Sequence, residues 1–153
     1  MPAPINVDES VVTPCGELFK TTAKHRNSAN PAASVWSINI SDEYDCFIEA
    51  LSYTDSSRVT DINYESLDET LCWGVNIDNA RLQSLGYNNL TSELFFGKFT
   101  KHMHNNEWHG YPADFIKKTQ DRPPLNFLVS LKENGLLTKS KMMRISRGQK
   151  CKI

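Results

Sequence analysis

Three of the four histidines lie close together in the sequence, beside two carboxylates. His102, His104 and His109 fall within eight residues, and Glu107 and Asp114 are nearby. Imidazole and carboxylate groups together suit zinc, manganese or iron, and such an ion can activate a water molecule for hydrolysis. The set His102, His109 and Asp114 is therefore a candidate metal site, and His109, Asp114 and Glu107 are candidates for general acid–base catalysis. These residues carry one hypothesis, a metal-dependent hydrolase or nuclease.

The spacing of the histidines argues against the simplest metal site. It matches neither the HExxH pattern nor a zinc finger. We expect a helix over residues 91–105, and in a helix His102 and His104 point about 200° apart, so they share a face only if the segment is extended. Core packing, solvent exposure or hydrogen bonding explains the same histidines without a metal, and the sequence predicts no cofactor. The chain has no GxSxG, P-loop or GxGxxG motif, which favours a protein without catalytic activity.

The charge of the chain changes sign along its length. Residues 1–115 contain 7 Lys and Arg against 16 Asp and Glu, a balance of −9, whereas residues 116–153 contain 10 against 2, a balance of +8. Cationic segments bind polyanions through salt-dependent contacts that need no base recognition. We therefore expect the C-terminal segment to contact an acidic macromolecule, nucleic acid or protein. The residues expected to make this contact are Lys117, Lys118, Arg122, Lys139, Lys141, Arg144 and Arg147.

The same charge pattern permits two other interpretations. The C-terminal cations can pair with the acidic remainder of their own chain or simply face solvent. Alternatively, the acidic body can bind a basic partner, as an immunity-type inhibitor binds its cognate toxin. We keep the first hypothesis, a small non-enzymatic binding or regulatory protein, together with the hydrolase and the inhibitor as alternatives.

The segment from Glu107 to Pro112 combines two aromatic residues with a glycine and a proline, and we expect it to be a stiff loop. Trp108 and Tyr111 are candidate binding residues, because Trp and Tyr are the usual anchors of protein interfaces. The competing interpretation is that both rings close the core beneath the loop.

The elements that must position these residues follow from periodicity. Apolar residues alternate in some segments and recur at i, i+3, i+4 and i+7 in another, which predicts strands around one amphipathic helix. We expect strands at 35–40, 59–64, 71–77 and 81–85 and a helix at 42–53 capped by Ser41, with a two-residue turn at 78–79.

The C-terminal segment carries the clearest helix signals. Pro123 and Pro124 open one helix, and Gly135 ends it in a Schellman cap. Thr138 is the expected N-cap of a second helix at 139–147. A further short helix is expected from Pro112 to Lys118. The predicted fold class is α+β: a small, mostly antiparallel sheet covered by helix 42–53, followed by a helical portion that ends in a basic helix-turn-helix-like pair.

Length and composition predict one domain over residues 1–153. Within it we expect an irregular arm (1–34), an α/β portion (35–90) and a helical, basic portion (91–153). The four cysteines have no zinc-ligand spacing, and the first residues resemble no secretory signal. No apolar run reaches the length of a membrane span. We therefore expect a cytoplasmic protein with reduced thiols and no membrane contact.

Overall fold

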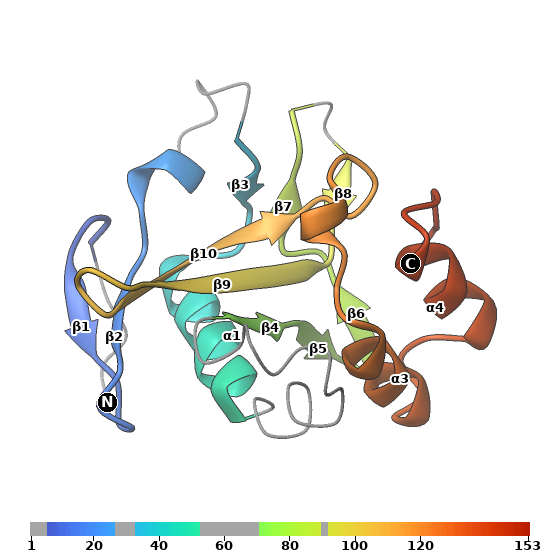
Figure 1. Ribbon diagram of the computed structural model, residues 1–153, viewed down its shortest axis with the longest axis horizontal. Helices are drawn as coiled ribbons and strands as arrows, with labels where there is room; N and C mark the ends of the chain where they lie inside the picture. Colours follow the sequence, from blue (N-terminus) through green and yellow to red (C-terminus); the bar gives the residue numbers. More distant parts are fainter. Residues whose placement is uncertain (1–5, 27–32, 53–70, 90–91) are drawn as a thin grey trace.

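A five-stranded sheet forms the centre of the protein (Figure 1). The computed structural model describes residues 6–26, 33–52, 71–89 and 92–153. The strand order is β1-β2-β10-β9-β4, and every pairing is antiparallel except that of β2 with β10. The strands are β1 (Ser10–Val12), β2 (Leu18–Lys20), β4 (Leu71–Gly74), β9 (Phe96–His102) and β10 (Glu107–Ala113). Together with the three α-helices among the described residues, this sheet confirms the expected α+β class.

The hairpin of β9 and β10 is the longest paired segment among the described residues, and each strand has seven residues. The predicted helix over 91–105 is wrong. Residues 96–99 are all buried, so both faces of β9 are covered, and the polar–apolar alternation that marks a half-exposed strand is missing. The helical spacing of the aromatic residues in this segment is a coincidence in a strand that is covered on both faces.

β10 also replaces the predicted loop at 107–112. The predicted short helix at 112–118 is wrong, because its first two residues belong to β10 and a turn follows. Pro112 lies inside the strand, which is unusual because proline cannot donate a ladder hydrogen bond. β2 pairs only with Glu107 and Trp108, so no strand forms ladder hydrogen bonds with β10 on that side at Pro112 and the proline is tolerated. A turn and the short 3-10 helix η3 (Thr119–Asp121) follow the strand.

The helix α1 (Ile40–Ser52) packs against one face of the sheet (Figure 1). The ring of Phe47 stacks on that of Phe19 at a centroid distance of 4.6 Å and lies 5.5 Å from the ring of Trp108. All three residues are almost fully buried. The expected helix at 42–53 is therefore confirmed, and its buried stripe forms the first of two core clusters.

The N-terminus of α1 differs from the prediction by two residues. The side-chain oxygen of Asn39 accepts a hydrogen bond from the backbone N–H of Asp42 at 2.8 Å, so Asn39 caps the helix in place of Ser41. The strand expected at 35–40 is consequently shorter and is confirmed only as β3 (Val35–Trp36).

The helices α3 (Leu125–Glu133) and α4 (Lys139–Ser146) pack beside one end of the hairpin, at the right of Figure 1. They form the second core cluster with side chains from the face of the sheet opposite α1. Its buried residues include Trp73, Phe96, Ala113, Phe127, Leu128, Leu131, Met142 and Ile145.

The predicted ends of these two helices are confirmed. Gly135 has φ +78°, and the N–H of Leu136 donates to the carbonyl of Leu131 at 2.9 Å, as a Schellman cap requires. The hydroxyl of Thr138 accepts from the N–H of Lys141 at 3.2 Å and caps α4.

Two small sheets complete the described fold. β3 pairs with β7 (Gly86–Tyr87), which pairs with β8 (Glu93–Leu94), and β5 (Asn76–Asp78) pairs with β6 (Arg81–Gln83). The strand expected at 71–77 is split at Val75 into β4 and β5, and β6 confirms part of the strand expected at 81–85. The turn between β5 and β6 consists of Asn79 and Ala80, both at positive φ, one residue later than expected.

The N-terminal arm is more regular than expected. The arm expected to be irregular contributes β1, β2 and the short helix η1 (Ala23–His25). Its strands have three residues each, which is too short for a periodic signal. The strand expected at 59–64 lies outside the described residues.

Candidate functional site

The C-terminal cations stand on the surface of α4 and of the turn after β10. Lys117, Lys118, Lys139, Arg144 and Arg147 are exposed. α4 turns Met142 and Ile145 into the core, which leaves its basic residues on the remaining circumference. We define the basic surface as Lys117, Lys118, Arg122, Lys139, Lys141, Arg144 and Arg147.

The basic surface makes no ion pair with any acid in the part of the chain that the structure describes. The five ion pairs found there belong to Lys20, Arg26, Lys98, Lys101 and His109. Neutralisation of the C-terminal cations by the acidic body therefore finds no support among the described residues.

Arg122 joins the two parts of the basic surface. Its Nε donates to the carbonyl of Phe115 at 3.3 Å. Its guanidinium also lies against Gly148, the residue that ends α4 at φ +67°, so closely that a Cβ at this position would overlap it. The turn that carries Lys117 and Lys118 is thereby held beside the C-terminal end of α4. Arg122 uses part of its hydrogen-bonding capacity inside the fold, and its positioning role was not foreseen.

The hairpin gathers the three clustered histidines at one end. The rings of His102 and His109 lie 4.4 Å apart between centroids, and those of His102 and His104 lie 5.8 Å apart. β9 ends at His102, and His104 lies in the turn that follows. The antiparallel register pairs His102 with Glu107, which brings the ring of His102 beside that of His109, two residues further along β10. Burial and the neighbouring imidazoles lower the pKa of His102.

Asp114 does not join the histidines. It follows the other end of β10, roughly 16 Å along the strand from His109 at about 3.3 Å per residue. There its carboxylate accepts hydrogen bonds from the side chain of Asn88 at 2.9 Å and from the N–H of Ile116 at 3.1 Å. The proposed metal set of His102, His109 and Asp114 is thus not assembled. Within the described ranges, no three His, Cys, Asp or Glu side chains have metal-binding geometry.

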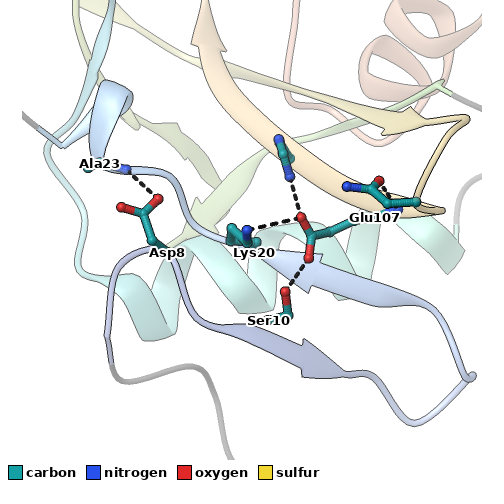
Figure 2. A network of polar contacts seen from close by, with 7 residues as sticks. Asp8, Ser10, Lys20, Ala23 and Glu107 are labelled. Carbon is teal, nitrogen blue, oxygen red and sulfur yellow. Dashed lines mark hydrogen bonds and ion pairs between the residues drawn. The ribbon is translucent and has the colours of Figure 1, made fainter.

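Glu107 is bound by three donors from three strands (Figure 2). Its buried carboxylate contacts the hydroxyl of Ser10, the Nζ of Lys20 at 3.4 Å and the Nε2 of His109 at 2.8 Å. Burial alone would raise the pKa of Glu107, but the hydrogen bonds from His109, Ser10 and Lys20 outweigh it and lower that pKa. The carboxylate therefore fastens β10 to the β1–β2 hairpin. This role explains Glu107 without catalysis.

Trp108 and Tyr111 point to opposite faces of β10, as residues at odd spacing in a strand must. Trp108 is 1% exposed, and its indole N–H donates to Glu17 at 3.0 Å, so it closes the core and offers no surface for a partner. Tyr111 is partly exposed. Its hydroxyl donates to Asp121 at 2.6 Å, and its ring stacks on that of His25 at 5.2 Å.

A buried charged pair beside Tyr111 was missed from the sequence. The Nζ of Lys98 lies 3.3 Å from the carboxylate of Asp121, donates to the carbonyl of Gln120 at 2.6 Å and stands 5.8 Å from the ring centroid of Trp73. Burial and Asp121 raise the pKa of Tyr111. Lys98 and Asp121 are far apart in the sequence, so no local spacing could have revealed the pair.

Comparison with known proteins gives no family. The chain matches no protein-family model, no curated protein and no solved structure. None of the helices in the described ranges has the length and apolar character needed to cross a membrane. The function must therefore be inferred from the geometry of the molecule itself.

Proposed function

We propose that this protein binds an acidic macromolecule through the basic surface and that it acts without catalysis, as a small cytoplasmic binding or regulatory protein. The observation that carries the proposal is the unpaired state of the basic surface within the described residues, on two segments that Arg122 holds together. Cations without an internal ion pair can meet phosphates or carboxylates without breaking one. Reduced thiols at all four cysteines agree with a cytoplasmic location.

The internal use of several acids favours this function over an inhibitor that binds through the acidic body. Glu17, Glu43 and Glu107 are engaged in ion pairs with Lys101, Arg26 and Lys20. These three acids form ion pairs inside the fold, whereas no cation of the basic surface does so among the described residues. The hydrolase hypothesis is weaker for a different reason, because Asp114 is held apart from the histidines.

Binding of this kind should depend steeply on salt. Each phosphate that a protein cation neutralises releases condensed counterions. A plot of the logarithm of the affinity for duplex DNA against the logarithm of the salt concentration therefore falls with a slope of about 0.9 per phosphate contact. Four such contacts would weaken binding about 100-fold between roughly 50 and 200 mM salt.

The proposal is tested by fluorescence anisotropy at low and moderate salt with three labelled probes: duplex DNA, single-stranded RNA and polyglutamate. We expect at least one probe to bind at low salt and the Lys139→Ala/Arg144→Ala double variant to bind it at least about tenfold more weakly. The charge-retaining control Lys139→Arg/Arg144→Lys should bind like the wild type. Absence of binding to all three probes at low salt, or equal binding by the alanine variant, would refute the proposal.

A further inference from the structure

A polar cavity lies at the end of β10 that is remote from the histidines. Its volume is about 200 Å³, and its walls come from η1, the segment before β3, the segment after β7, the end of β10, the turn that follows β10, and η3. This space suits a small polar ligand and is less than a drug-sized molecule needs.

The acids of the cavity wall already have donors. One carboxylate oxygen of Asp114 accepts from the N–H groups of Ile116 and Lys117 at 3.1 and 3.3 Å, and the other accepts from Asn88. Asp121 forms an ion pair with Lys98 and accepts a hydrogen bond from the hydroxyl of Tyr111. Both carboxylates therefore have hydrogen-bond donors within the fold, but only that of Asp121 is paired with a cation.

The lysines of the cavity wall have no such partners. Lys24, Lys117 and Lys118 line the cavity from two separate segments of the chain, and all three are exposed. None of them takes part in an ion pair with a described residue. Asp121 is paired with Lys98, so three lysines face the single unpaired carboxylate of Asp114 and the charge balance at the cavity is positive.

The aromatic part of the wall is rigid. The Nδ1 of His25 lies 2.9 Å from the carbonyl of Ser34, which fixes Nδ1 as the protonated nitrogen, and the ring stacks on Tyr111. Burial lowers the pKa of His25, so the ring is neutral near pH 7. Ser34 in turn donates to the carbonyl of Pro112 at 2.6 Å. A preformed wall of this kind reduces the ordering that a ligand would otherwise have to induce.

We propose that this cavity binds a phosphomonoester group, with Lys24, Lys117 and Lys118 as its charged donors. Three ammonium groups match the several oxygens and the double charge of a phosphomonoester better than the two oxygens of a carboxylate. The group can belong to a free small molecule or to the 5′ end of a nucleic acid. Lys117 and Lys118 also belong to the basic surface, but Lys24 and His25 do not, so the inference does not depend on the proposed function.

Phosphate binding is tested by titrating ¹⁵N-labelled protein with inorganic phosphate and following the amide signals. We expect saturable shifts gathered at Lys24, His25, Lys117 and Lys118, and smaller shifts with acetate at equal ionic strength. Lys24→Ala removes one charged donor and should weaken phosphate binding about tenfold. Lys24 is exposed, so the substitution does not threaten folding.

The matched control is the Lys139→Ala/Arg144→Ala variant, which removes charge outside the cavity and should bind phosphate within about twofold of the wild type. Retained phosphate binding in this variant separates the cavity from the proposed function. Shifts scattered over all lysines, or equal losses in the two variants, would overturn the inference. A 5′-phosphorylated oligonucleotide that binds more tightly than its 5′-hydroxyl counterpart only when Lys24 is present would identify a nucleic-acid end as the source. Equal binding of the two oligonucleotides, with inorganic phosphate still bound, would identify a free small molecule.

Discussion

At the scale of single residues, Glu107 shows how a functional candidate can be a structural residue. Its type and its place near three histidines suit acid–base chemistry, but Ser10, Lys20 and His109 already occupy its carboxylate. A group that is ionised, buried and multiply bonded stabilises the fold through its charged form.

This role predicts a pH-dependent stability. The folded pKa of Glu107 lies below the ordinary value of 4.5, so its contribution is complete above that value and is lost as the pH falls through the folded pKa. Glu107→Gln should lower the free energy of unfolding by about 1–3 kcal/mol at pH 7, and the difference from wild type should shrink near pH 3. Urea unfolding at both pH values measures this, with exposed Glu93→Gln as the control. A difference that does not change with pH would contradict the assigned charge.

Gly148 and Gly135 form a matched pair for the contact with Arg122. Both end a helix at positive φ, but a Cβ at Gly135 meets open space, whereas one at Gly148 meets the guanidinium of Arg122. Each alanine substitution should cost about 1 kcal/mol for the backbone. Gly148→Ala should cost about 0.5–1.5 kcal/mol more, because Arg122 must leave the carbonyl of Phe115.

Urea unfolding measures both glycine substitutions, and an Arg122→Ala background supplies the double-mutant control. In the Arg122→Ala background, Gly148→Ala and Gly135→Ala should lower the free energy of unfolding by equal amounts. If they are already equal with Arg122 present, its guanidinium does not hold the turn against α4.

At the scale of elements, the helices could be predicted from the sequence and the long hairpin could not. α1, α3 and α4 each have an apolar stripe, and the caps Gly135 and Thr138 are encoded locally. β9 is covered on both faces, so its burial depends on partners distant in the sequence, and its aromatic spacing indicated the wrong element. The same dependence on distant partners hid the pair of Lys98 and Asp121.

The cap of α4 gives a prediction at this scale. Thr138→Ala removes the hydroxyl that accepts from the N–H of Lys141 and should lower the free energy of unfolding by about 1 kcal/mol. Ser140→Ala, an exposed position in the first turn of α4, is the control and should change stability by less than about 0.5 kcal/mol. Thermal and urea unfolding report both values, and equal effects of the two substitutions would show that the hydroxyl of Thr138 does not cap α4.

At the scale of the whole molecule, the net charge of −1 is the sum of a negatively charged N-terminal part and a positively charged C-terminal part. The sequence alone located the basic segment. It could not show which cations remain unpaired, because pairing depends on the approach of segments distant in the chain. Among the described residues, Glu17, Glu43 and Glu107 form ion pairs within the fold, whereas the cations on α4 and on the turn after β10 form none. A surface of this kind attracts polyanions over a Debye length of about 8 Å at physiological salt.

The most direct test of this account is the slope of binding affinity against salt concentration, measured with duplex DNA, RNA or polyglutamate, whichever binds. For duplex DNA, we expect Lys139→Ala/Arg144→Ala to make the logarithmic slope shallower by about 1.8, since each cation accounts for about 0.9. A wild-type affinity that is insensitive to salt, or a slope that the substitutions leave unchanged, would contradict binding through the basic surface.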